Sequence, residues 1–333
     1  MKSHAIRQYL VSLVARSAYT TGRIGRFNVV LALLPEMGQV RAAGAAAALR
    51  VSYPRVEFAI VTGVCGGVPL PSPGREILLG DVVISKKIVQ YDFGRLYSDK
   101  FVVRDAVDHS LVGAPTILGS LLAKLQADHN LNLMKESTGE FLKKIQEKDR
   151  LSRYRYPGAG NDRLFPANYQ HRHRAGNFSS AELDCDCRNH KTAGDPVCPE
   201  SRELSCGKAQ CELSALEIRK RLEVKKSYES CHQNEKAQAP AIFVGTIGSG
   251  NNVIRSGVDR DEIARRHSGI LAFEMESFGV WNSIPCIMVK GVCDYADSHK
   301  NKDWQHFAAA TAAAATKALL QRHTKRDASP RPR

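Results

Sequence analysis

The chain has 333 residues, of which 43% are hydrophobic and 25% are charged. These values are typical of a soluble globular protein that folds as one large domain or two ordinary ones. No apolar run approaches the roughly 20 residues that a helix needs to cross a bilayer, so we expect no membrane partner. The formal net charge of +14 raises the question of nucleic acid binding. The basic excess, however, lies in residues 150–174 and after Lys317, without a nucleic-acid-binding motif, so we expect no nucleic acid partner.

The N-terminal segment is basic, with its first acidic residue at Glu36. This composition is typical of a mitochondrial presequence, although an ordinary solvated first segment is the simpler interpretation. Nine cysteines without a secretory signal favour reduced thiols. We therefore expect a cytoplasmic protein, with a mitochondrial location as the alternative.

The first half of the chain alternates apolar runs with helical patterns. Predicted strands lie at 28–34, 56–62, 81–85 and 87–91, and predicted helices at 38–50, 116–127 and 137–148. The second strand leads directly into a glycine-rich turn at residues 63–67.

The character of the chain changes between residues 150 and 240, where only residues 212–225 are convincingly helical and the rest reads as an irregular Cys/Arg-rich insertion. Strands then return at 241–246, 270–273 and 286–292, with helices at 262–267, 274–282 and 304–320, before a disordered basic tail at 321–333. This alternation predicts an α/β fold with a twisted, mostly parallel central sheet. Ligands of such sheets bind beyond the carboxyl ends of the strands.

Glu274, Met275 and Glu276 stand at a predicted strand–helix junction. One plausible arrangement is that Glu274 supports the structure while Glu276 accepts hydrogen bonds from vicinal sugar hydroxyls, with Met275 as an apolar floor. A carboxylate there would stabilise the oxocarbenium-like state of glycosidic cleavage. The alternative is an acid-rich helix N-terminus that is favoured by the helix dipole.

Asp294 ends an apolar strand next to Cys293. A partly desolvated carboxyl at this place could donate a proton to a purine nitrogen, which makes the base a better leaving group. The alternative is a strand-terminal Asp that caps the following turn. The Glu-Met-Glu run favours the first interpretation.

The glycine turn and the cysteines give weaker signals. Gly63, Gly66 and Gly67 would let backbone amides approach a ligand, although a purely structural turn is an equal alternative. Six cysteines and two histidines of the insertion have the residue types of a zinc site, namely Cys185, Cys187, Cys198, Cys206, Cys211, Cys231, His190 and His232. The spacing of Cys206 and Cys211 is tolerable for paired zinc ligands, but that of Cys185 and Cys187 is too short, so we expect free thiols and no metal.

Several segments, taken as an ordered set, resemble one known family. They are YTTGRIG at 19–25, NVV at 28–30, VTGVCGGVP at 61–69, LGDVVIS at 79–85, VQYDFG at 89–94, GTIGSGN at 245–251, FEMES at 273–277 and GVCDYADSHKN at 291–301. The set is similar to the purine/uridine nucleoside phosphorylase superfamily, in particular its fungal branch, which is related to methylthioadenosine nucleosidases. The resemblance predicts a single domain over residues 19–320, with an atypical segment at 1–18.

The resemblance implies a three-layer α/β/α sandwich, a small-molecule nucleoside as partner and a possible homo-oligomer. It implies that Glu276 binds the ribose hydroxyls, that Met275 packs on the sugar and that Asp294 contacts a purine base. Residues 63–67 are implied to form part of a phosphate or water pocket. Glu274, Phe273, Cys293 and Gly248 complete the expected substrate-binding set.

Two departures from the family pattern limit this interpretation. Val61 and Val64 stand where phosphorolytic members have an arginine and a serine that hold phosphate. The usual first strand, with a Pro-x-Glu motif that handles the attacking water, is not found in residues 1–18; Glu36 is one substitute. We therefore expect glycosidic cleavage of purine nucleosides by water or by phosphate as co-substrate, without another cofactor. The alternative is a catalytically weak or inactive module that binds or senses a nucleoside, and a zinc-stapled interaction protein is a third interpretation.

Overall fold

A computed structural model describes residues 19–34, 36–98, 101–103, 112–113, 116–150, 152–173, 197–267 and 269–322. The expected atypical segment at 1–18, most of the expected tail, and Cys185, Cys187 and His190 lie outside these ranges. The expected tail boundary is too early, because the last helix continues to Arg322.

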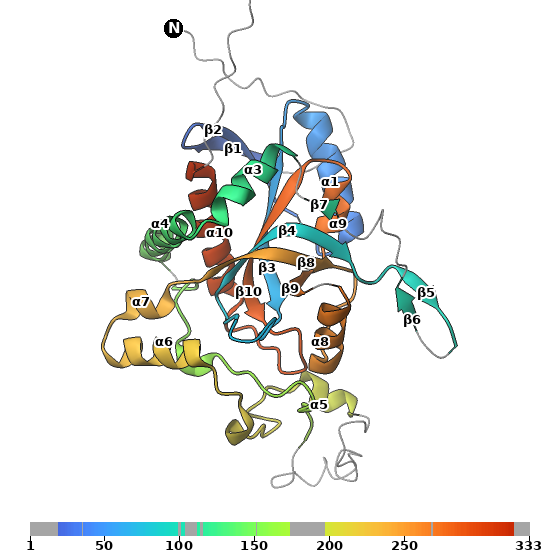
Figure 1. Cartoon of the computed structure of the whole chain (residues 1–333), viewed down its shortest axis with the longest axis vertical. Coiled ribbons are helices and arrows are strands. Elements are labelled where there is room, and N and C mark those ends of the chain that lie inside the picture. Colours follow the sequence, from blue (N-terminus) through green and yellow to red (C-terminus); the bar gives the residue numbers. More distant parts are fainter. Residues whose placement is uncertain are drawn as a thin grey trace, which may run out of the picture.

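The strands are β1 (Tyr19–Ile24), β2 (Phe27–Ala32), β3 (Ala59–Gly67), β4 (Val82–Gln90), β5 (Gly94–Leu96), β6 (Phe101–Val103), β7 (Val112–Gly113), β8 (Ile242–Ser249), β9 (Ile270–Glu274) and β10 (Cys286–Asp294). The helices are α1 (Gln39–Ser52), α3 (Thr116–Leu125), α4 (Asp128–Lys148), α5 (Pro199–Glu203), α6 (Lys220–Ser230), α7 (Asn234–Gln238), α8 (Gly257–Arg266), α9 (Ser277–Trp281) and α10 (Gln305–Arg322), with short 3-10 turns η1 (Ala159–Asn161) and η4 (Leu213–Ala215). Figure 1 shows the sheet at the centre, with helices on both sides. The expected α/β class is confirmed.

The central sheet has the strand order β10-β3-β9-β8-β4-β7, and β10 also pairs with β4. Five of these strands therefore form a closed ring. The three long pairings, β10 with β3, β4 with β8 and β8 with β9, are parallel. The antiparallel pairings span only two or three residue pairs each. As a consequence β3 and β9 meet only near their carboxyl ends.

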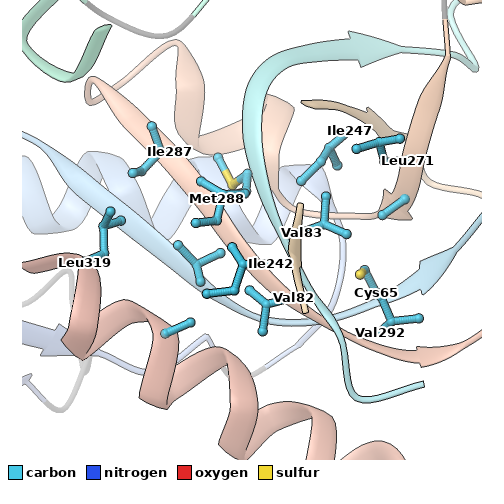
Figure 2. Packing of buried hydrophobic residues seen from close by; sticks show 14 of the residues in the cluster. Cys65, Val82, Val83, Ile242, Ile247, Leu271, Ile287, Met288, Val292 and Leu319 are labelled. Atoms are coloured by element: carbon cyan, nitrogen blue, oxygen red, sulfur yellow. The ribbon is translucent and has the colours of Figure 1, made fainter. Parts of the chain in front are cut away.

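The core lies inside and around this ring (Figure 2). Every residue of β9 is buried, as are the first seven residues of β10, which explains their largely apolar sequences. Helix α10 packs on β10 and β3 with an alanine-rich face. The approach is so close that a Cβ at Gly291 would overlap the backbone of Ala308. Small side chains on α10 are therefore what lets the helix cover the sheet.

Several predicted elements differ from the structure. The strand predicted at 28–34 is β2, which pairs with β1 in a separate hairpin around Gly25 (φ 58°) rather than in the buried sheet. Leu31 and Leu33 are consequently 59% and 83% exposed. The strands predicted at 81–85 and 87–91 are one strand, β4, with a register shift after Ser85. Residues 63–67 are the last part of β3 and not a turn.

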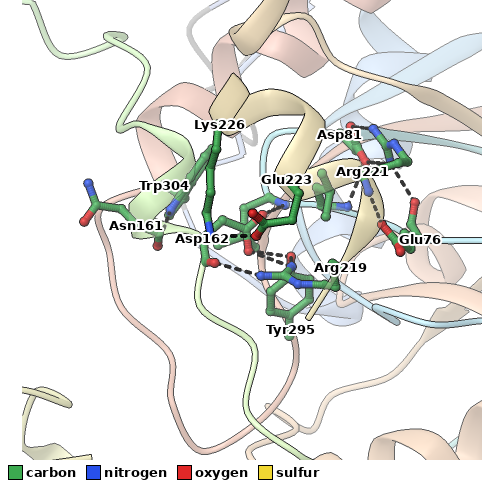
Figure 3. A network of polar contacts seen from close by, with 12 residues as sticks. Glu76, Asp81, Asn161, Asp162, Arg219, Arg221, Glu223, Lys226, Tyr295 and Trp304 are labelled. Atoms are coloured by element: carbon green, nitrogen blue, oxygen red, sulfur yellow. Dashed lines mark hydrogen bonds and ion pairs between the residues drawn. The ribbon is translucent and has the colours of Figure 1, made fainter. Parts of the chain in front are cut away.

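The expected insertion is joined to the core by the ion pair of Arg221 with Asp81, and a second, fully buried pair lies within the insertion (Figure 3). The helix predicted at 212–225 begins only at Lys220. The residue before it, Arg219, has an extended backbone and a buried side chain. Arg219 there is 1% exposed and donates to Asp162 Oδ1 at 2.8 Å. Arg221 donates to both carboxylate oxygens of Asp81, at 2.7 and 3.1 Å. Asp81 caps the turn before β4 by accepting from the Leu78 amide, and through Arg221 it also anchors the insertion.

Among the described residues, no helix is both long and apolar enough to pass through a membrane. The boundaries expected for the domain and for the insertion stay predictions.

Candidate functional site

A cavity of about 2880 Å³ extends from the β1–β2 hairpin to the carboxyl ends of β3, β9 and β10. Nearly all residues expected at the site line it, namely Gly63, Gly66, Phe273, Glu274, Met275, Glu276, Cys293 and Asp294. Gly67 and Gly248 are not among its lining residues. The carboxyl ends of three strands thus supply one surface, as expected for an α/β sheet.

Gly66 is the point where the two acid-bearing strands approach each other. It pairs with Phe273 of β9 on one side and with Asp294 of β10 on the other. A Cβ on Gly66 would lie 2.9 Å from Asp294 Oδ1 and 3.0 Å from the Ala296 Cβ. Two strand spacings separate the backbones of β9 and β10 by about 10 Å at this level. Glycine is therefore required here for close approach and not for a turn.

Glu274, Glu276 and Lys290 form a triad at the inner end of the cavity. The Lys290 ammonium lies 3.2 Å from Glu274 Oε2 and 2.8 Å from Glu276 Oε2. The Glu274 side chain has no exposed surface and also accepts from the backbone amides of Glu276 and Ser277, at 3.0 and 3.1 Å. It therefore holds the start of α9, which agrees with the structural role that was one expectation for it. The Glu276 side chain is 17% exposed and faces the cavity.

The charges of this triad stabilise one another. Burial acts to raise the pKa of the Glu274 carboxyl, but the Lys290 ammonium and the amide donors outweigh it and hold that pKa below its usual value. Burial acts to lower the pKa of Lys290, while Glu274 and then Glu276 raise it above the ordinary lysine value. Glu274 and Lys290 therefore form a buried pair of opposite charges.

Asp294 stands on the other side of Gly66 with a side chain that is 16% exposed. Its Oδ1 accepts from the Ala296 amide at 2.8 Å and lies 3.1 Å from Lys300 Nζ. Ala296 has a positive φ of 51°, so Asp294 caps a tight turn. The Cys293 thiol lies 3.5 Å from Asp294 Oδ2, and burial followed by the Asp294 charge raises the pKa of this thiol. The capping role is thus present, and it uses Oδ1, while Oδ2 contacts the Cys293 thiol.

The remaining expected residues form the apolar part of the wall. Met275 is half-buried in the cavity lining. Phe273 packs edge-to-face on Tyr91, with ring centroids 5.3 Å apart. A Cβ on Gly248 would lie 2.9 Å from the Phe273 ring, so this glycine makes room for the phenylalanine. Gly248 therefore contributes to the cavity wall indirectly, by allowing the Phe273 ring to pack there.

Sequence reasoning missed three residues here: Lys290, Lys300 and Tyr91. Lys290 carried a signal, because a lysine inside an otherwise apolar strand must find a charged partner when that strand is buried. No sequence pattern indicated that Lys300 or Tyr91 belongs to the site, because their positions at the cavity depend on the tertiary fold. Val61 and Val64 line the cavity with side chains that cannot bind an anion.

The sequence and the structure were compared with those of known proteins. Residues 9–135 match the family model of the phosphorylase superfamily. A nucleotide-binding leucine-rich repeat (NLR)-like protein of Hyaloscypha variabilis is 30% identical over 308 residues, which are 91% of this chain and 25% of the relative. The chain thus spans about a quarter of the length of the relative that it matches.

Solved structures of low sequence identity are also similar. A methylthioadenosine/S-adenosylhomocysteine nucleosidase of S. pneumoniae matches with a TM-score of 0.48 and 16% identity, covering 93% of this chain and 87% of that one. The futalosine hydrolase of Helicobacter pylori matches with a TM-score of 0.48 and 12% identity, covering 92% and 85%.

Proposed function

Since residues 9–135 match the family model of the phosphorylase superfamily, we propose that the chain cleaves the N-glycosidic bond of purine nucleosides. One observation carries the proposal: Glu276 and Asp294 line the same cavity from two strands that Gly66 brings together. Two partly exposed carboxylates in one cavity match a substrate with two polar ends, the sugar and the base.

The two acids have different roles in the reaction. Glu276 accepts hydrogen bonds from the ribose hydroxyls, and its charge favours the positive charge that grows on the sugar as the bond breaks. Asp294 hydrogen-bonds or protonates the base so that it leaves as a neutral purine. Lys290 holds the Glu276 carboxylate in place at 2.8 Å, so Lys290 is a positioning residue.

The charges around Glu276 favour water over phosphate as the attacking group. Val61 and Val64 offer no donor to an anion, and the nearby Lys290 is already paired with two carboxylates. With two glutamates around one lysine, the triad has a formal charge of −1, which repels phosphate but does not affect neutral water. Hydrolysis is therefore the version of the reaction that we favour.

Product analysis tests the proposal. The purified chain is incubated with adenosine, inosine, guanosine and methylthioadenosine, with and without phosphate, and free base is measured by chromatography. We expect base release that does not need phosphate. Asp294→Asn should lower kcat by about a hundredfold or more, because it removes the acid. Asp303→Asn, an exposed acid outside the cavity lining, is the matched control and should retain activity. No base release by folded protein from any of the four would contradict the proposal.

A second candidate function is nucleoside binding without turnover. It is favoured by the similarity to one quarter of a much longer NLR-like protein, since a domain in such a chain can act as a sensor. Calorimetry with the same nucleosides separates the two: heat of binding without base release supports the sensor, and base release supports the enzyme.

A further inference from the structure

A cluster of four metal-ligating side chains lies outside the lining of the cavity. It consists of His171, Cys206, Cys211 and His299, and one ligand atom from each lies within 4.8 Å of all the others. They come from three segments: the loop after η1, the turn between α5 and η4, and the loop after β10. Only tertiary folding brings them together.

The spacing of the cluster fits a tetrahedral metal site. In a zinc site with Zn–S of about 2.3 Å and Zn–N of about 2.1 Å, a sulfur and a nitrogen ligand lie about 3.6 Å apart. The Nδ1 atom of His299 lies 3.6 Å from Cys206 Sγ and 3.8 Å from Cys211 Sγ. Two sulfurs and two imidazoles are also one of the ligand sets that structural zinc uses.

Both imidazoles are oriented as metal ligands would be. His299 Nε2 lies 2.9 Å from the carbonyl oxygen of Tyr169 and donates to it, which leaves the Nδ1 lone pair directed at the two thiols. His171 Nδ1 lies 2.9 Å from the carbonyl oxygen of Ser201, which leaves Nε2 for the cluster. A backbone carbonyl that fixes the tautomer in this way is the usual outer partner of a metal-bound histidine.

Three of the four side chains in the cluster are buried, and Cys206 is partly buried. His171, Cys211 and His299 are 3%, 9% and 8% exposed. The ring of Phe165 packs on His299 with centroids 4.2 Å apart. Two cysteines can ionise in such a place only with a positive partner, because burying an unpaired charge is costly. A divalent cation supplies it.

We propose that His171, Cys206, Cys211 and His299 bind a structural Zn²⁺ ion. His171 ligates through Nε2 and His299 through Nδ1, and the cysteines ligate as thiolates. With four protein ligands the coordination sphere is complete, so the ion has no open position for catalysis.

The ion links the insertion to the loop after β10, which carries Lys300 of the candidate site. His299 is adjacent to Lys300, whose ammonium lies 3.1 Å from Asp294 Oδ1. The His299 amide also donates to Asp297 Oδ1 at 2.9 Å, which makes this loop a tight turn. Zinc therefore holds the loop after β10 in the conformation that places Lys300 beside Asp294.

Metal analysis of the full chain, purified without chelator and dialysed against zinc-free buffer, tests the proposal. We expect one zinc ion per chain in the wild-type protein and loss of this zinc in Cys211→Ser and His299→Ala. Cys231→Ser, an exposed cysteine at the end of α6, is the matched control and should retain the metal. A chelator should lower the Tm of the wild type and of Cys231→Ser, and should leave the Tm of Cys211→Ser unchanged.

A second measurement guards against variants that fail to fold. Cobalt is added to wild-type protein from which the metal has been removed, and the absorption of a tetrahedral thiolate–cobalt centre should appear and saturate at one equivalent. Absence of both zinc and the cobalt spectrum would overturn the proposal. An intact mass that shows a Cys206–Cys211 disulfide in the freshly isolated protein would overturn it as well. Both readouts are independent of nucleoside cleavage.

Discussion

At the scale of single residues, Gly66 determines the geometry of the candidate site. It pairs with both acid-bearing strands, and the space that a side chain would need is occupied by Asp294 Oδ1 and by Ala296. The neighbours are a short carboxylate and backbone of a tight turn, neither of which can move away freely. A glycine is therefore needed at position 66 because of the position of Asp294, and not because of its own backbone conformation.

We expect Gly66→Ala to lower kcat/KM for base release by about a hundredfold, because a displacement of about 1 Å at a reacting group has an effect of this size. Gly139→Ala in α4 is the matched control, since nothing lies within 4 Å of the position that its added methyl group would occupy. That change should leave activity intact and stabilise the helix by about 0.5–1 kcal/mol. Equal activity of both variants would show that Asp294 does not need its present position.

At the scale of elements, a buried network joins the insertion to the strand that ends in Asp294. Arg219 donates to Asp162 Oδ1 at 2.8 Å and to the Tyr295 hydroxyl at 2.5 Å, and that hydroxyl donates to the same Asp162 oxygen at 2.7 Å. Burial and the Asp162 carboxylate raise the pKa of the Tyr295 hydroxyl, whereas Arg219 lowers it. The net effect is an increase, so the hydroxyl stays protonated. The network therefore holds Tyr295, the residue directly after Asp294, in place.

Arg219→Met should lower the free energy of unfolding by about 3–5 kcal/mol, because it leaves the Asp162 carboxylate buried without its cation. Lys226→Met is the matched control on α6, where the pair with Glu223 is exposed on both sides. Its loss should change the stability by at most about 1 kcal/mol. Urea titrations of both variants measure the difference, and similar midpoints would mean that the Arg219 pair contributes little to the fold.

At the scale of the whole molecule, the closed ring of strands places two buried opposite charges at its centre. Lys290 is 2% exposed, and the Glu274 carboxylate is fully buried. Since the pKa of Glu274 is lowered on folding, its contribution to stability is present above its unfolded pKa of about 4.3. That contribution is lost as the pH falls below this value towards the folded pKa. The pair thus makes the fold sensitive to acid.

Glu274→Gln should reduce the slope with which the free energy of unfolding falls below about pH 5, because the variant has no carboxylate to protonate at this position. Glu235→Gln is the matched control, since its pair with Lys143 is exposed. It should retain the wild-type slope. Denaturation curves at a series of pH values give the slopes directly, and an unchanged slope in Glu274→Gln would contradict the linkage.

The sequence by itself determined the α/β class, most helices and strands, and the residues at the strand ends, since these depend on local apolar patterns and on residue chemistry. Glu276, Met275 and Asp294 lie on one cavity as their positions at strand ends predict. The site roles assigned to them stay predictions until activity is measured.

The tertiary structure alone decided which distant residues meet. Lys290 between two glutamates results from the packing of β10 beside the end of β9, and His299 beside Cys206 results from docking of the insertion. Likewise β2 reads as a buried strand, yet it pairs only with β1 and stays half-exposed. Local sequence encodes the tendency of a segment to be buried, whereas its partners are set by contacts between residues far apart in the chain, which no local pattern records.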